Sequence, residues 1–302
     1  MSELPPYDAT TPRRRLVLAV VIIVVAAIVV AGCGALVIWW IGAESGSAPP
    51  VPVSPRCVVS TGDGNAQLAI DQAENAAIIA GVAIGRDLAP RAVSIALTTA
   101  LQESGLRNLD YGDRDSLGLF QQRPSMGWGT EEQVMDPYYS SGKFYDVMVT
   151  VPNWDTADIG DVAQAVQRSG FPDAYDKHIS RARLLATALS GQTPAAWSCV
   201  SPTSDPPDPA SLDNAIAQAY GATITASLVP ASDSAPATLT LSATSTSAAW
   251  SAAAFAQSWA SSTGVSSVQV GSQIWQASTT VLPSWTDASQ SPVGPTHVVV
   301  TF

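Results

Sequence analysis

The chain has 302 residues, enough for one large domain or two of moderate size. Charged residues make up 13% of it, about half of the ~25% usual in soluble domains, and the formal net charge is -11. This acidic balance excludes the basic stripe that binds nucleic-acid backbones, so no nucleic-acid partner is expected. Three cysteines and two histidines are too few for a typical structural zinc site. The sequence therefore predicts no metal and no cofactor.

An apolar stretch without a charge covers residues 16–41, more than the roughly 20 residues needed to cross a bilayer. Three arginines precede it directly, and two tryptophans lie near its far end. The positive-inside rule then predicts a cytoplasmic tail over 1–15, a single-pass anchor in the plasma membrane, and an extracytoplasmic location for the rest. In an alternative interpretation Cys33 is the lipidated N-terminus of a cleaved lipoprotein, but the apolar residues after it favour an uncleaved anchor.

Two cysteines, Cys57 and Cys199, lie beyond this stretch, on the side of the membrane where disulfides persist. We expect them to form a bridge, because two exposed thiols outside the cell would oxidise. In the chain-entropy model a loop of this length gains roughly 4–5 kcal/mol of stability from its closure. The alternative is a pair of unrelated free thiols.

Stretches rich in Pro and Ser at 42–56 and 201–211 predict two linkers, which separate a domain at 57–200 from a second at 212–302. The first domain holds 17 acidic and 10 basic residues, whereas the chain after 201 has no Lys or Arg. The C-terminal domain will therefore not attract anionic wall polymers by charge. Docking of an envelope protein is as consistent with its tryptophan-rich sequence as sugar binding.

Apolar spacing predicts helices and strands in a clear order. In the middle segment the expected helices cover 68–85, 90–104, 137–149, 159–169 and 175–190. In the C-terminal segment helices are expected over 212–220 and 248–262, and strands over 237–242, 265–270, 273–277 and 296–302. The predicted fold class is thus an N-terminal transmembrane helix, a mainly α middle domain and a small C-terminal α+β domain.

One acidic residue has a position that suits catalysis. Glu103 ends the helix expected over 90–104, which is apolar nearly all round and hence central. A carboxylic acid partly removed from water there can hold a proton at neutral pH and donate it to a leaving oxygen. On spacing alone, a surface glutamate at a helix end explains the pattern better.

The neighbouring motifs change this balance. Residues 103–105 are Glu-Ser-Gly, and residues 117–122 are Leu-Gly-Leu-Phe-Gln-Gln. This ordered pair resembles the soluble lytic transglycosylase and goose-type lysozyme family, in which an E-S motif ends a central helix and a G-L-M-Q strand lines the sugar cleft. The resemblance covers about residues 65–190 and is closest to the goose-type enzymes over 111–121. It implies a lysozyme-like fold that acts on the β-1,4 glycan strands of peptidoglycan.

The resemblance assigns roles to individual residues. It implies that Glu103 is the proton donor to the glycosidic oxygen and that Asp113 helps to place water. The residues it implies for substrate binding are Ser104, Gly118, Leu119, Gln121 and Gln122. If Asp113 reaches the scissile bond, two carboxylates act in hydrolysis. If it does not, the 6-hydroxyl of the substrate closes onto the anomeric carbon, which is the transglycosylase outcome.

Two departures from the family pattern bear on activity. The second acid of the goose-type pattern falls at about Arg123, and Val166 replaces a tyrosine that normally holds the catalytic glutamate. Gln167 is a candidate to supply the missing hydrogen bond and a contact in the cleft. Trp128, between two glycines, is the best aromatic candidate for stacking on a sugar ring.

The sequence thus predicts a membrane-anchored, extracytoplasmic enzyme that cleaves peptidoglycan glycan strands with Glu103 as general acid and base. The alternative is a non-catalytic peptidoglycan-binding or envelope-scaffold module on the same fold, favoured by the two departures.

Overall fold

The computed structural model describes residues 16–17, 19–32, 53–169, 171–202, 206–288 and 290–302. It divides into two compact units, residues 1–51 and residues 52–302. In the first unit residues 16–17 and 19–32 are helical. Within the described ranges, no helix is both long and apolar enough to cross a membrane. The predicted transmembrane helix over 16–41 is therefore wrong, and its part over 33–41, including Cys33, lies outside the described residues.

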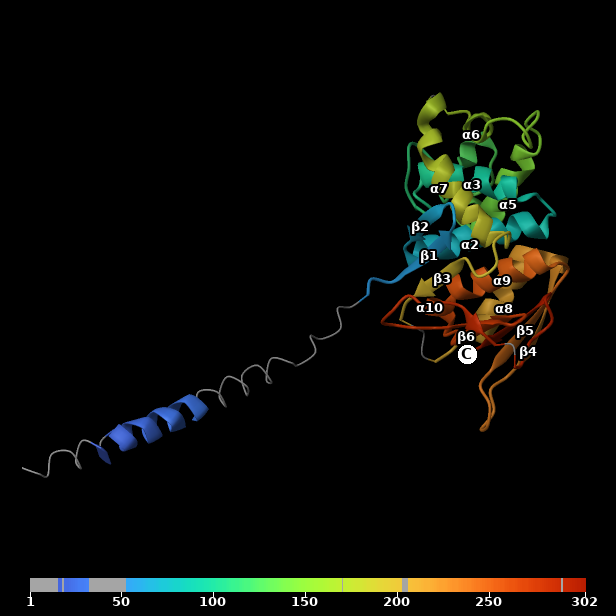
Figure 1. The fold of residues 1–302 in the computed structure, drawn as a ribbon. Coiled ribbons are helices and arrows are strands. Elements are labelled where there is room, and N and C mark those ends of the chain that lie inside the picture. Colours follow the sequence, from blue (N-terminus) through green and yellow to red (C-terminus); the bar gives the residue numbers. More distant parts are fainter. Residues whose placement is uncertain (1–15, 18, 33–52, 170, 203–205, 289) are drawn as a thin grey trace, which may run out of the picture. The chain divides into compact units, whose positions relative to one another are not determined.

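In the second unit, one helix is enclosed by the others, as its sequence predicts. This helix, α3 (Pro90–Glu103), is buried without interruption from Ala92 to Leu101 and begins with a proline in its first turn. It packs mainly against α7, α6 and α2 (Figure 1). The helices around it are α2 (Ile70–Gly85), α4 (Glu131–Met135), α5 (Pro137–Met148), α6 (Ile159–Gln167) and α7 (Asp176–Leu189), with short 3-10 turns η1 (Pro124–Met126) and η2 (Pro172–Ala174).

A three-stranded antiparallel sheet joins the two ends of this helical segment. Its order is β2 (Gly64–Leu68), β1 (Arg56–Thr61) and β3 (Trp197–Val200). Cys57 stands directly opposite Cys199 in the β1–β3 register, and the two form a disulfide across 142 residues of sequence. The predicted bridge is confirmed.

The C-terminal part is a six-stranded antiparallel sheet with helices against one face. The strands lie in the order β4 (Ile224–Val229), β5 (Thr238–Ala243), β9 (His297–Thr301), β6 (Ser267–Val270), β7 (Gln273–Gln276), β8 (Thr286–Asp287). The helical elements of this part are α8 (Pro209–Tyr220), η3 (Gly221–Thr223), α9 (Thr246–Ser258) and α10 (Ala260–Thr263). Helix α9 is buried from Ala248 to Ser258, because it contacts the sheet on one side and α2 on the other.

The helical segment and the C-terminal part share one hydrophobic core. Helix α2 packs against both α8 and α9, between the two groups of elements (Figure 1). A side chain on Gly85 of α2 would place its Cβ 2.6 Å from the carbonyl oxygen of Ala219, so this helix crossing requires glycine.

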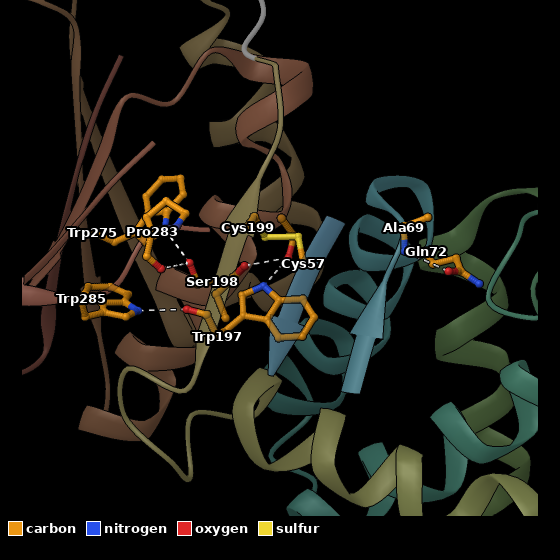
Figure 2. Close-up of a disulfide and its surroundings, with 11 residues drawn as sticks. Cys57, Ala69, Gln72, Trp197, Ser198, Cys199, Trp275, Pro283 and Trp285 are labelled. Atoms are coloured by element: carbon orange, nitrogen blue, oxygen red, sulfur yellow. Dashed lines mark hydrogen bonds between the residues drawn. A yellow bond between two sulfur atoms is a disulfide. The ribbon is translucent and has the colours of Figure 1, made fainter. Parts of the chain in front are cut away.

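Tryptophans add a polar connection at strand β3. Trp275 Nε1 donates to Ser198 Oγ at 3.0 Å, and Trp285 Nε1 donates to the carbonyl oxygen of Trp197 at 2.9 Å (Figure 2). Ser198 Oγ in turn donates to the carbonyl oxygen of Pro283 at 2.6 Å. The C-terminal part is therefore held by the same strand that carries Cys199, with the tryptophan rings in the packing rather than on an open surface.

These observations correct the predicted fold class. The described chain is a mixed α+β structure with two antiparallel sheets, in place of a transmembrane helix, a mainly α domain and a small α+β domain. The predicted helices of the middle segment are present, with ends within about two residues. Strand β3 escaped prediction because it pairs with β1 across 142 residues and is buried on both faces, without an alternating pattern. The local hairpin of β1 and β2 was also missed.

Candidate active site

Glu103 lies in a groove with a volume of about 570 Å³. It is the last residue of the buried helix α3, and its side chain is half-buried. Three parts of the chain form the walls of the groove: the loop over 113–128, helix α5 and the C-terminal end of α6. The carboxyl group is thus fixed to a rigid element and yet accessible from solvent.

A buried tyrosine holds this carboxyl group. Tyr175 Oη donates a hydrogen bond of 2.6 Å to Glu103 Oε1, and its ring is 1% exposed. Burial raises the pKa of Tyr175, and its contact with the Glu103 carboxyl raises this pKa further. The phenol therefore stays protonated and remains a donor at any working pH. Tyr175 directly precedes α7 and is 72 residues away from Glu103 in sequence, outside both motifs.

The turn that follows the acid is fixed on both sides. Ser104 Oγ donates to the carbonyl oxygen of Leu119 at 2.7 Å, which ties the helix end to the second motif. Gln72 Nε2 donates to the carbonyl oxygen of Gly105 at 2.7 Å. Gln72 Oε1 accepts from the backbone N–H of Ala69 at 3.0 Å (Figure 2). One glutamine side chain thus caps the start of α2 and positions the turn.

The second motif forms a tight loop rather than a regular strand. Leu117 and Gln122 exchange two backbone hydrogen bonds of 3.0 Å. Gly118 has φ +76, and a Cβ at this position would lie 2.3 Å from the carbonyl oxygen of Val134. Both the left-handed backbone and the close approach require glycine here.

The structure brings five of the predicted site residues to one groove. They are Glu103, Asp113, Gln121, Trp128 and Gln167. The other four predicted binding residues are not part of its lining.

These four residues support the walls of the groove without lining it. Leu119 is fully buried, and Gln122 is 1% exposed with its Nε2 donating to the carbonyl oxygen of Ser140 at 3.0 Å. Ser104 and Gly118 act through the backbone contacts described above. In this structure all four position the walls of the groove.

Gln167 makes a different contact from the one considered in the sequence. Its Nε2 donates to the carbonyl oxygen of Phe120 at 2.7 Å, which links the end of α6 to the second motif. The donor to Glu103 is Tyr175, a tyrosine from another helix. The loss of a tyrosine at Val166 therefore does not leave the acid without a phenol partner.

The acidic residues of the loop have separate roles. Asp115 accepts from the backbone N–H of Ser125 at 2.8 Å and from Arg123 Nε at 2.7 Å. Interaction with the Ser125 side chain, together with these two bonds, holds the pKa of Asp115 well below its usual range. Asp115 thus fixes the loop. Asp113 has a side chain that is 88% exposed and lies 3.9 Å from Arg114. It is the acid of the loop that lines the groove with Glu103.

No family model and no curated protein matches this sequence.

Proposed function

We propose that this chain cleaves the glycan strands of peptidoglycan, with Glu103 as general acid and base. One observation carries the proposal: a carboxyl group at the end of a buried helix lies in an open groove and accepts a hydrogen bond from a buried tyrosine. The resemblance of residues 103–105 and 117–122 to lytic transglycosylases and goose-type lysozymes supports the same substrate class. The disulfide supports an extracytoplasmic location, because such bonds persist in oxidising compartments.

The geometry suits proton transfer in two directions. In the first step Glu103 gives its proton to the glycosidic oxygen, and the bond between this oxygen and the anomeric carbon breaks. The resulting carboxylate is stabilised by the hydrogen bond from Tyr175, which stays protonated. In the second step the carboxylate takes a proton from the attacking nucleophile, so the acid returns to its starting state.

The nucleophile distinguishes two reactions. Water gives hydrolysis, in which Asp113 acts as the second carboxylate from the loop wall of the groove. The 6-hydroxyl of the substrate gives an anhydro sugar and needs no second acid. In either reaction Glu103 carries the proton.

Digestion of purified peptidoglycan tests the proposal. We expect release of soluble muropeptides, and mass spectrometry of their ends separates anhydro sugars from reducing sugars. Binding of peptidoglycan without any release would contradict the enzyme and support the non-catalytic module, which the ion-paired Arg123 at the second acid position favours. Docking of an envelope protein on residues 212–302 stays a separate prediction.

Removal of the tyrosine hydroxyl should slow the reaction. In Tyr175→Phe the Glu103 carboxylate loses its 2.6 Å donor while the ring still fills its place. A hydrogen bond to a charged group contributes about 1.5–3 kcal/mol, so we expect kcat to fall about 10–100-fold. Turnover of soluble glycan strands measures this effect.

The matched control for this variant is Tyr220→Phe. Tyr220 is also fully buried, and its hydroxyl lies 2.8 Å from Ser251 Oγ, away from the groove. This second variant should retain the activity of the wild type. Equal activity of Tyr175→Phe and Tyr220→Phe would remove Tyr175 from the mechanism.

A further inference from the structure

The lining of the groove has a different balance of acidic and basic residues from the segment that forms it. Residues 57–200 contain 17 acidic and 10 basic residues. The lining of the groove instead has three basic residues, Arg123, Lys143 and Arg168, and two acidic ones, Glu103 and Asp113. Basic side chains are therefore concentrated here, although the surrounding surface is acidic.

One of the basic residues already has polar partners within the protein. Arg123 donates to Asp115 Oδ1 at 2.7 Å and to Ser125 Oγ at 3.3 Å, so it holds the loop. Lys143 is different, because the described residues supply it with no ion pair. Asp146, the acid one helical turn further along α5, pairs with Arg86 instead.

Lys143 and Arg168 form the α5/α6 wall of the groove. Arg168 follows the C-terminal end of α6, where a cation also stabilises the helix, so its presence has a structural explanation. Lys143 lies in the middle of α5 and is half-buried. Partial burial of a charge without a partner costs free energy, which an anionic ligand would recover. Lys143 is therefore the residue that points to such a ligand.

We propose that the α5/α6 wall binds the free carboxylates of the peptide stems that peptidoglycan strands carry. The inference rests on the proposed function, since it names the part of the substrate that this wall recognises. In a stem-bearing strand the lactyl carboxyl of each muramic acid is bound in the amide that holds its stem, so the free carboxylates of the stems are the anionic groups that a lysine can select. The substrate class is then glycan with free stem carboxylates.

A comparison of two substrates tests this. We would measure kcat/KM of the full chain on soluble strands with stems and on the same strands after their stem carboxylates have been converted to neutral methyl amides. A solvent-accessible ion pair contributes up to about 1 kcal/mol, or about fivefold, so the wild type should prefer strands with free stem carboxylates by about fivefold. Lys143→Met should lose this preference, and Lys143→Arg should keep most of it.

Lys177→Met is the charge-matched control, because Lys177 is exposed on α7 outside the groove lining. It should keep the preference. Equal rates of the wild type on both substrates, or an undiminished preference in Lys143→Met, would overturn the inference while cleavage itself stands. If the wild type cleaves neither substrate, the proposed function fails, and sedimentation binding of both strands then decides the inference: a Lys143-dependent preference supports it, and equal binding overturns it.

Discussion

Glu103→Gln should abolish the release of soluble muropeptides from peptidoglycan. A positioned general acid contributes about 10²–10⁴-fold to a rate, and an amide cannot donate a proton to the leaving oxygen. The amide has the same shape as the acid, and its oxygen still accepts the hydrogen bond from Tyr175. The variant should therefore keep the fold and the groove while it loses the reaction. Muropeptide release over time measures the loss, and thermal unfolding checks the fold.

A second glutamate provides the control. Glu74 on α2 accepts a hydrogen bond of 2.8 Å from Ser262 Oγ and lies outside the groove lining. Burial raises the pKa of Glu74, so Glu74→Gln replaces a partly buried acid in the same way. It should leave activity intact. Wild-type rates in Glu103→Gln would exclude this residue as the acid.

Loss of the disulfide should have the largest effect on stability. Cys57→Ala/Cys199→Ala opens a loop of 142 residues, which the chain-entropy model values at about 4–5 kcal/mol. For a unit of this size we expect the melting temperature to fall by roughly 10–20 °C. Circular dichroism during heating measures the shift.

Reductant separates this bond from other effects of the substitutions. It should lower the melting temperature of the wild type and leave that of the double variant unchanged. A wild-type melting temperature that does not respond to full reduction would show that the bridge contributes little. Because Cys57 and Cys199 are both buried, the extent of reduction must be verified by thiol counting.

Local patterns predicted the helices well. Helix α3 follows from its apolar residues and from Pro90 at its start, and α5 follows from Pro137 after the capping residue Asp136. Strand β3 did not follow, because its partner is remote in sequence; the hairpin of β1 and β2 is local, but no strand was predicted there. Strand β3 has four residues, all buried, and nothing in its own sequence indicates that it pairs with β1. The described residues also lack the membrane-spanning helix that length and hydropathy suggested.

The candidate site, too, was predictable where its residues are close in sequence and not where they are remote. Two short motifs placed Glu103 and Gln121 in one groove, because both motifs lie within 20 residues of each other. Tyr175 could not be paired with Glu103 from sequence, since only the packing of α7 on α3 brings them together. Its signal was an aromatic residue directly before an amphipathic helix, a pattern that ordinary core packing also produces.

Strand β3 also sets the order in which this molecule can be completed. A chain is made from its N-terminus, so β1 and the Cys57 thiol appear long before their partner strand. The helices between them and the β1–β2 hairpin can form early from local contacts, whereas the β1–β3 pairing must wait for residue 199. Trp275 and Trp285, whose indole N–H groups donate to β3, are synthesised later still. An oxidant that acts before residue 199 is made meets the Cys57 thiol without its partner. A chain cut short after residue 200 would have its bridge but no cover for Trp197.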